Sequence, residues 1–272
     1  MKSLKNKVVV ITGAASGIGR ALAVRFAAEA ANLVLADKDG TGLAQTREQC
    51  CGTGVVKTLQ VNVARREEME AMARDTIAWF GCVDVVVNNA GVSSIGLIQN
   101  LTYETIQWTI DTNLWGVIHG TKAFLPHLLA RPEANLVNIS SVYGLIGVPG
   151  QAAYCTSKFA IRGFTEAVRQ DLRGTGVAVT IVFPAGVRTQ IVKNSRTDSS
   201  IPPAELERLR QRFEKGLRSS PDEVAEAILR GIYRNAPRVL IGAYARRIDL
   251  LARTMPGSYD VVVARVMARL LS

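Results

Sequence analysis

The fold class of this chain is decided by residues 8–19, Val8-Val9-Val10-Ile11-Thr12-Gly13-Ala14-Ala15-Ser16-Gly17-Ile18-Gly19. Four consecutive β-branched residues at its start predict a strand buried on both faces of a sheet. The three glycines follow at once, and a helical pattern continues from them through Phe26 to Ala30. Glycine tolerates the tight backbone of a turn from strand to helix. The segment therefore predicts a strand, a glycine-rich turn and a helix in succession.

The same alternation continues along the chain. Further apolar runs predict strands at 33–36, 55–61, 83–87, 135–139, 177–182 and 238–242. Helical patterns separate the first of these strands at 41–50, 65–80, 103–129 and 154–174. Strands that alternate with helices favour a parallel sheet with right-handed crossovers. We expect an α/β fold with a doubly wound parallel sheet in three layers, as one domain over residues 1–272.

The chain beyond residue 189 has a different character. Residues 190–203 are polar and loop-like, a charged helix is predicted at 205–217, and we expect 190–219 to form a lid over a substrate. Ser220-Pro221-Asp222-Glu223 is typical of a helix start. In 243–272, apolar residues recur at helical spacing with arginines between them, which predicts a C-terminal extension of amphipathic helices.

Composition narrows the class of protein. With 272 residues and 48% hydrophobic residues, the chain can bury a sizeable core. Its net charge of +10 is spread out, without a dense basic run or an aromatic series, which argues against nucleic-acid binding. A basic rim that attracts an anionic cofactor or substrate fits better. No apolar run approaches the ~20 residues of a membrane span, and no cleavable signal is visible at the N-terminus.

Two weaker signals concern cysteines and histidines. Cys50, Cys51, Cys82 and Cys155 match neither a disulfide framework nor a zinc spacing, so we expect a reducing, cytoplasmic setting. His119 and His127, eight residues apart, lack an evident third ligand, and we predict no metal site. Cys155 is interpreted as a small packing residue rather than a nucleophile.

The glycine-rich turn has the properties of a phosphate site. Glycines at 13, 17 and 19 permit backbone N–H groups to approach a pyrophosphate at a helix N-terminus, with Ser16 and Ile18 beside it. The spacing is Gly-x-x-x-Gly-x-Gly, which differs from the usual dinucleotide fingerprint. For the glycines alone, an ordinary glycine-rich turn is a competing interpretation.

Asp37 follows the second predicted strand, where a carboxylate can accept hydrogen bonds from a ribose 2′-hydroxyl and repel a 2′-phosphate. Lys38 comes directly after it and can neutralise a phosphate. Ser16 places no positive charge in the glycine turn. The pattern favours NAD over NADP, with NADP remaining the alternative.

Tyr154 and Lys158 lie four residues apart at the start of a predicted helix, on the same face and one turn apart. A free phenol titrates near pH ~10, and an adjacent ammonium favours the phenolate. The pair can therefore supply a proton-transfer group and the cation that tunes it. The same spacing is common on solvated helix faces.

Taken together in order, these motifs resemble the short-chain dehydrogenase/reductase family over roughly residues 5–190. The resemblance rests on Thr12-Gly13-x-x-x-Gly17-x-Gly19, Asn88-Asn89-Ala90-Gly91, Asn113, Ser141, Tyr154-x-x-x-Lys158 and Pro184-x-Gly186-Val187-x-Thr189. It implies a Rossmann domain, NAD or NADP as cofactor, and an alcohol or carbonyl substrate.

The resemblance also implies catalytic roles. Tyr154 would be the base in alcohol oxidation and the acid in ketone reduction. Lys158 would lower the Tyr154 pKa and hydrogen-bond the nicotinamide ribose, and Ser141, preferred to Ser140 because it lies 13 residues before the tyrosine, would orient the substrate oxygen. Asn113 would support a water that extends a proton path to Lys158.

Cofactor contacts are implied in the same way. Asn62 and Val63 would line the adenine, Asn89, Ala90 and Gly91 the ribose side, and Val187 and Thr189, after Pro184, the carboxamide. Two positions depart from the family pattern, namely Ala185 for a frequent glycine and Asn62 for a frequent aspartate. Neither change removes a catalytic group.

Partners and alternatives follow from the same resemblance. Extra apolar residues on the predicted helices at 103–129 and 154–174, including Trp108, Trp115, Phe159 and Phe164, indicate a homodimer or homotetramer, or else packing on the sheet. The C-terminal helices would cover the active site or a neighbouring subunit, contact a membrane peripherally, or bind a partner protein. A catalytically silent nucleotide sensor and a 3-oxoacyl thioester reductase are the alternative functions, and the sequence does not identify the substrate.

Overall fold

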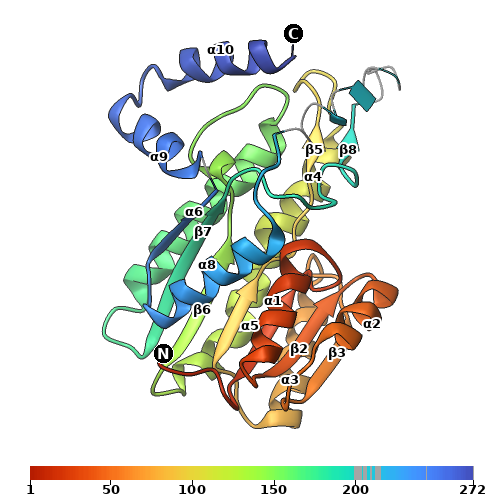
Figure 1. Ribbon diagram of the computed structural model, residues 1–272, viewed down its shortest axis with the longest axis vertical. Helices are drawn as coiled ribbons and strands as arrows, with labels where there is room; N and C mark the ends of the chain where they lie inside the picture. The colour runs from red at the N-terminus through yellow and green to blue at the C-terminus, as the bar shows by residue number, and fades with distance from the viewer. Residues whose placement is uncertain (199–203, 205–206, 209, 212–215, 243, 272) are drawn as a thin grey trace.

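A seven-stranded parallel sheet forms the centre of the protein in the computed structural model, which describes residues 1–198, 204, 207–208, 210–211, 216–242 and 244–271. The strand order is β3-β2-β1-β4-β6-β7-β9 (Figure 1). The strands are β1 Val8–Thr12, β2 Asn32–Asp37, β3 Val56–Gln60, β4 Val85–Asn88, β6 Ala134–Ile139, β7 Val177–Pro184 and β9 Arg238–Ile241. The predicted doubly wound parallel sheet is confirmed.

Helices cover both faces of this sheet and give the three expected layers (Figure 1). The first face carries α1 Gly17–Ala28, α2 Gly40–Gln49 and α8 Pro221–Tyr233, and the second carries α3 Arg66–Phe80, α5 Gly116–Leu129 and α6 Ala152–Asp171. In β1, Val9 and Ile11 pack toward the first face and Val10 toward the second. Because each face of the sheet packs against a layer of helices, successive residues of the strands are apolar, with no alternation of apolar and polar residues.

The sheet changes direction between β1 and β4. From β1 the chain proceeds outward through β2 and β3, and it then returns to β4 and proceeds the other way through β6, β7 and β9. Val9 is paired with Leu33 on one side and with Val85 on the other. In such sheets the crevice beyond the carboxyl ends of the strands at the reversal is the usual ligand site.

The helix predicted over 103–129 is continuous but not regular. It consists of α4 Tyr103–Ile110, a π-helical turn η1 Asp111–Trp115, and α5. The Thr102 side chain caps its start by accepting a hydrogen bond from the Thr105 N–H. The wider π turn contains Asn113, which is completely buried.

A second, two-stranded sheet was not predicted. β5 Ser94–Ile95 pairs in parallel with β8 Arg196–Thr197. Backbone hydrogen bonds from Arg196 N to Ser93 O (3.1 Å) and from Asp198 N to Ile95 O (2.9 Å) join the two segments. The prediction of an irregular loop over 190–203 is therefore wrong at Arg196–Thr197. Much of the predicted helix at 205–217, including Leu206 and Phe213, lies outside the described residues, as does Ile201.

The C-terminal helices form as predicted. A capping box between Ser220 and Glu223 starts α8, and α9 Ala245–Thr254 and α10 Tyr259–Leu271 follow β9. Both final helices lie beyond one end of the sheet (Figure 1). Among the helices that the structure describes, none combines the length and hydropathy needed to cross a membrane.

Candidate active site

A cavity of about 1050 Å³ opens beyond the carboxyl ends of the central strands. It is lined by residues from the turn after β1, the ends of β2, β4, β6 and β7, the start of α6, and the segments around β5 and β8. Sixteen of the eighteen residues predicted for the site line this cavity, and Gly19 and Asn113 lie behind its wall.

The glycine turn after β1 is shaped by close backbone approach. Gly13 has φ +67°, and a Cβ there would lie 2.7 Å from the Ala90 Cα. At Gly19, a Cβ would lie 2.0 Å from the Gly13 carbonyl oxygen. Gly17 begins α1 with φ +53° beside the Thr189 side chain, with Ser16 as N-cap. The turn therefore brings a helix N-terminus and its free N–H groups to the cavity.

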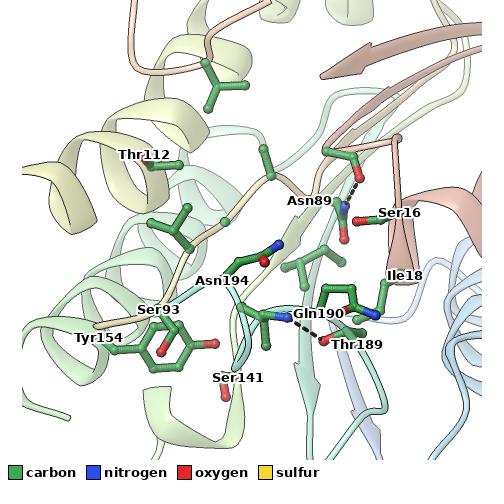
Figure 2. Close-up of a pocket in the computed structure, with 18 of the residues that line it drawn as sticks. Ser16, Ile18, Asn89, Ser93, Thr112, Ser141, Tyr154, Thr189, Gln190 and Asn194 are labelled. Atoms are coloured by element: carbon green, nitrogen blue, oxygen red, sulfur yellow. Dashed lines mark hydrogen bonds between the residues drawn. The ribbon is translucent and has the colours of Figure 1, made fainter. Parts of the chain in front are cut away.

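The segment after β4 is fastened to this turn. The Thr12 hydroxyl accepts hydrogen bonds from the Asn89 and Ala90 N–H groups at 3.0 and 3.1 Å. The Asn89 side-chain amide donates to the Thr12 and Gly13 carbonyl oxygens at 2.9 and 3.1 Å (Figure 2). These bonds fix Asn89, Ala90 and Gly91 along one wall of the cavity.

Asp37 ends β2, as the sequence predicts, and its carboxylate faces the turn. One oxygen accepts from the Ala15 N–H at 3.0 Å and the other from the Asp39 N–H at 3.1 Å. Asp37, Lys38 and Asp39 all line the cavity. The carboxylate is thus held in place by the backbone, with lone pairs left for a ligand hydroxyl.

The two further cofactor segments lie on opposite sides of the turn. Asn62 and Val63 follow β3, and the side-chain oxygen of Asn62 accepts a hydrogen bond from the Ala64 N–H at 3.1 Å. Pro184, Val187 and Thr189 follow β7 and line the cavity. Ala185 does not have a positive φ, so alanine is unstrained at this position, where the family often has glycine.

These features fit a dinucleotide. At Gly13 and Gly19 a side chain would collide with the backbone, which leaves the concave space that a pyrophosphate requires. The N-terminus of α1 points N–H groups at that space, and Asp37 offers a hydroxyl acceptor at its edge. The residues that would hold the cofactor are therefore brought together by the fold.

Tyr154 and Ser141 lie at the other end of the cavity (Figure 2). Tyr154 is half-buried in the first turn of α6, and Ser141 caps a 3₁₀ turn, η2 Val142–Gly144, after β6. Burial raises the pKa of Tyr154 above its usual value, and a hydrogen bond with Ser141 acts in the opposite direction. Tyr143 packs edge-on against Tyr154, with ring centroids 6.0 Å apart.

Lys158 lies one turn further along α6 and is 3% exposed. Its Nζ donates to the Ile139 carbonyl oxygen at 3.1 Å and lies 5.6 Å from the Tyr154 ring centroid. Burial lowers the Lys158 pKa from 10.5 to about 8. The pKa of Tyr154 is raised in this structure because burial of the phenol outweighs its hydrogen bond with Ser141, and the lowering of that pKa by Lys158 stays a prediction.

The geometry also separates the two neighbouring serines. Ser140 is buried, and its hydroxyl donates to the Lys158 carbonyl oxygen at 2.8 Å. Ser141 accepts from the Tyr143 N–H at 3.2 Å and faces the tyrosine. Both serines line the cavity, and Ser141 is the one that hydrogen-bonds Tyr154.

Asn113 does not reach the cavity. Its side-chain oxygen accepts from the Val92 N–H at 2.8 Å, and its amide donates to the Val92 carbonyl oxygen and the Ser157 hydroxyl at 3.0 and 2.9 Å. Ser157 in turn donates to the Tyr154 carbonyl oxygen. Both amide hydrogens of Asn113 are therefore donated to other protein groups. The side chain joins Val92, on the cavity wall, to Ser157 of α6 and so helps to position both segments.

Several cavity residues have no signal in the sequence motifs. They lie mostly at the tyrosine end and are Ser93, Gln151, Gln190, Asn194 and Arg196. Trp108, predicted for subunit contacts or sheet packing, also lines the cavity, and the Arg196 guanidinium lies 4.1 Å above its ring. Ser93 follows β4, Gln151 follows β6, and Gln190, Asn194 and Arg196 follow β7. This position after a strand is the one feature that could have indicated them.

His119 is used in packing. His119 Nδ1 lies 3.0 Å from the Val63 carbonyl oxygen, and its ring stacks at 5.6 Å from that of Trp115. Within the described part of the chain, no three or more His, Cys, Asp or Glu side chains gather as a metal site would require.

Comparison with known proteins agrees with this geometry. A family model described as short chain dehydrogenase matches residues 7–200. The chain is 42% identical over 273 residues to the "Putative oxidoreductase SadH" of Mycobacterium tuberculosis, covering 99% of this chain and 98% of that protein. It is 33% identical over 268 residues to human estradiol 17-beta-dehydrogenase 11, covering 97% and 84%. A crystal structure of a short chain dehydrogenase/reductase from Burkholderia phymatum in complex with NAD superposes with a TM-score of 0.84 at 30% identity, covering 94% and 96%.

Proposed function

This chain belongs to the short-chain dehydrogenase/reductase family, whose members are oxidoreductases that use NAD or NADP, and we propose that it interconverts an alcohol and a ketone with Tyr154 as the proton-transfer group. One observation carries the proposal. Tyr154, Ser141 and Lys158 lie in the same cavity as the glycine turn and Asp37. A hydroxyl pair at one end and a phosphate cradle at the other are what hydride transfer to or from a carbon–oxygen bond requires.

The chain's own residues handle the proton. When bound, the nicotinamide supplies or takes up the hydride, which is the chemistry of the cofactor. Ser141 and Tyr154 hydrogen-bond the substrate oxygen, and the phenol gives its proton to that oxygen in reduction or receives it in oxidation. Because burial raises the Tyr154 pKa, the neutral phenol is the resting form at pH 7, ready to donate.

Lys158 has the complementary task. With a pKa of about 8, it is mostly an ammonium at pH 7, and it lies beside the tyrosine with one hydrogen bond to protein in the described chain. An ammonium near the phenol stabilises the phenolate that forms when the proton leaves. Its other N–H groups are available to hydrogen-bond a ribose hydroxyl.

The proposed cofactor is NAD rather than NADP. The fixed Asp37 carboxylate at the edge of the cavity accepts from a 2′-hydroxyl and repels a 2′-phosphate. Lys38, also on the cavity wall, is the competing positive charge. The similar structure from Burkholderia phymatum contains NAD, which supports the same choice.

The decisive experiment is a screen of secondary alcohols and ketones with NAD and NADP in parallel, on wild type and on Tyr154→Phe. Tyr154→Phe should lower turnover by about 10²- to 10⁴-fold while cofactor binding changes little. Tyr233→Phe, whose hydroxyl donates to Glu29 far from the cavity, is the matched control and should keep wild-type turnover.

Each other outcome has a definite meaning. A fully active Tyr154→Phe enzyme would falsify the role of the tyrosine. Cofactor binding without turnover of any alcohol or ketone would indicate the nucleotide sensor. Activity confined to 3-oxoacyl thioesters would indicate the thioester reductase.

We also propose that the protein is a homodimer or homotetramer, since members of the family assemble into oligomers. Aromatic side chains on the outer surface of α4, η1 and α6 support this, with Tyr103 88%, Trp115 45% and Phe159 37% exposed. Light scattering after size exclusion measures the mass. Trp115→Glu should shift it toward the monomer, and Trp79→Glu on α3 provides a control with similar exposure.

A further inference from the structure

The C-terminal helices have one face that is already used. Ile248 and Ala252 of α9 and Tyr259 and Val263 of α10 pack on a small cluster formed by Ile146, Val148 and Cys155. The Tyr259 hydroxyl accepts a hydrogen bond from the Gly147 N–H at 3.2 Å. The helices are thereby fixed to the loop that connects Ser141 with Tyr154.

The opposite face of α9 is apolar at its centre and basic at its edges. Leu250 is 62% exposed, and at helical spacing it lies between Arg246 and Arg253 on one side and Arg247 on the other. All three arginines are exposed. A leucine surrounded by guanidinium groups is not covered by any described part of this chain.

The acidic residue of α9 pairs with one of the three arginines on this face, Arg253. Asp249 is half-buried on the inner side, where it pairs with Arg238 at 2.7 Å and with Arg253 at 3.1 Å. Arg246 and Arg247 have no carboxylate within salt-bridge distance among the described residues. Over residues 243–272 the chain has five arginines and two aspartates, with no lysine or glutamate.

Two further apolar side chains of the C-terminal segment are exposed. Met255 in the turn after α9 and Val261 on α10 are 41% and 48% exposed. The Gly96 N–H donates to the carbonyl oxygen of Gly150, which belongs to the loop between Ser141 and Tyr154. The exposed Leu97 and Ile98 therefore lie beside that loop. We call the exposed residues of the final helices the tail surface, which consists of Arg246, Arg247, Leu250, Arg253, Met255, Val261 and Arg265.

We propose that the tail surface binds peripherally to an anionic lipid membrane. Separate apolar side chains with arginines between them match an interface in which apolar groups enter the acyl boundary and guanidinium groups meet lipid phosphates. A protein partner of complementary shape would need a concave or continuous apolar patch, which these two convex helices do not form. Charge complementarity therefore favours lipid as the occupant.

Binding there would place the cavity near the membrane. The loop beneath the tail surface lines the tyrosine end of the cavity through Val142, Tyr143 and Gln151. In the small core under α9, Ile248 packs with Tyr143. Resting on the proposed function, this geometry points to apolar alcohols or ketones that partition into membranes as the substrate class.

The test is flotation of the purified full-length protein with vesicles, which requires no turnover and so is independent of the proposed function. Wild type should float with vesicles of phosphatidylcholine and phosphatidylglycerol, should not float with phosphatidylcholine alone, and should be released by salt. The double variant Arg246→Gln/Arg247→Gln should weaken binding at least about tenfold, because each basic residue near an anionic surface contributes.

Matched variants separate the tail surface from general charge. Arg47→Gln/Arg74→Gln removes two exposed arginines from α2 and α3, and it should bind vesicles like wild type. Leu250→Ser should weaken binding to anionic vesicles, whereas Val55→Ser, a change at a 49% exposed residue before β3, should not. Far-ultraviolet circular dichroism and thermal unfolding verify that each variant is folded.

Two results would overturn the proposal. The first is equal flotation of the tail and control double variants, which would show that binding depends on net charge alone. The second is absence of flotation together with a smaller mass for Leu250→Ser by light scattering, which would make the tail surface a contact between subunits.

Discussion

At the nucleotide end of the cavity, the walls are formed largely by the turns that follow strands of the central sheet, and hydrogen bonds fasten these turns to one another. Thr12 and Asn89 connect β1 to the segment after β4, and Asp37 holds the glycine turn. At the tyrosine end, short elements such as η2 and the two-residue strands β5 and β8 form the walls, supported from outside by α9 and α10. At the nucleotide end, a side chain at Gly13 or Gly19 would collide with the backbone. At the tyrosine end, we expect the weaker contacts between short elements to tolerate substitutions better.

The largest effect is expected at the nucleotide end. In Gly19→Ala the new Cβ would lie 2.0 Å from the Gly13 carbonyl oxygen, which is backbone and cannot move without opening the turn. We expect the variant to lose cofactor binding and about 3 kcal/mol or more of the free energy of unfolding. Denaturant unfolding and cofactor titration measure the two effects.

Gly163→Ala is the control for this change. Gly163 lies within α6, and nothing is within 4 Å of a Cβ at that position. Because alanine favours a helix interior more than glycine does, its free energy of unfolding should rise by up to about 1 kcal/mol. Equal losses in the two variants would show that the glycine turn is not the rigid region described here.

The second prediction concerns Lys158, whose pKa falls from 10.5 to about 8 because the folded protein disfavours the buried charge. Between these values the unfolded chain holds a proton that the folded chain has released, so this residue makes stability rise with pH. Below pH 8 both states are protonated, and the cost of burying the charge is fully present. The rise over this whole window should be on the order of 3 kcal/mol.

Urea unfolding of wild type and Lys158→Met from neutral pH to about pH 10 isolates this contribution. The difference between the two free energies should change with pH in favour of wild type, since the variant has no proton to release at that position. Parallel curves would mean that the Lys158 ammonium is well solvated in the folded protein and that its pKa is ordinary.

How much of this the sequence could predict depends on the same two regions. The apolar runs of β1, β2 and β4 and the glycines after β1 have local causes, so their structures and their place at the cavity follow from residue types. The pairing of Ser94–Ile95 with Arg196–Thr197 joins residues about a hundred positions apart and involves two residues on each side. Such a short pairing leaves no periodic signal.

Properties that depend on burial could not be predicted from the sequence either. The spacing of Tyr154 and Lys158 indicates their proximity, but the direction of the tyrosine pKa depends on how much protein surrounds the phenol. The π turn that buries Asn113 has no local signature in Asp111–Trp115. In each case the missing information is tertiary packing rather than residue type.

The third prediction tests the discrimination at the nucleotide end. Asp37→Asn keeps the shape of the side chain and removes the charge that would repel a 2′-phosphate. The ratio of kcat/KM for NADP to that for NAD should rise by about tenfold or more, since hydrogen bonds and contacts with charged groups contribute about 1.5 to 3 kcal/mol. Measuring both cofactors on one variant cancels any loss of folded enzyme. An unchanged ratio would assign the discrimination to another group, with Lys38 the nearest candidate.

The smallest effect belongs to the tyrosine end. Tyr259→Phe removes the hydroxyl that accepts from the Gly147 N–H, an exposed hydrogen bond that water can replace. We expect the free energy of unfolding to fall by less than about 1 kcal/mol and turnover to stay close to wild type. Hydrogen exchange at Gly147 should nevertheless become faster, because α10 would no longer hold the amide, while exchange at Ala90, which donates to Thr12, should not change. Faster exchange at both amides would mean that the two ends of the cavity open together, and the contrast between them would then be wrong.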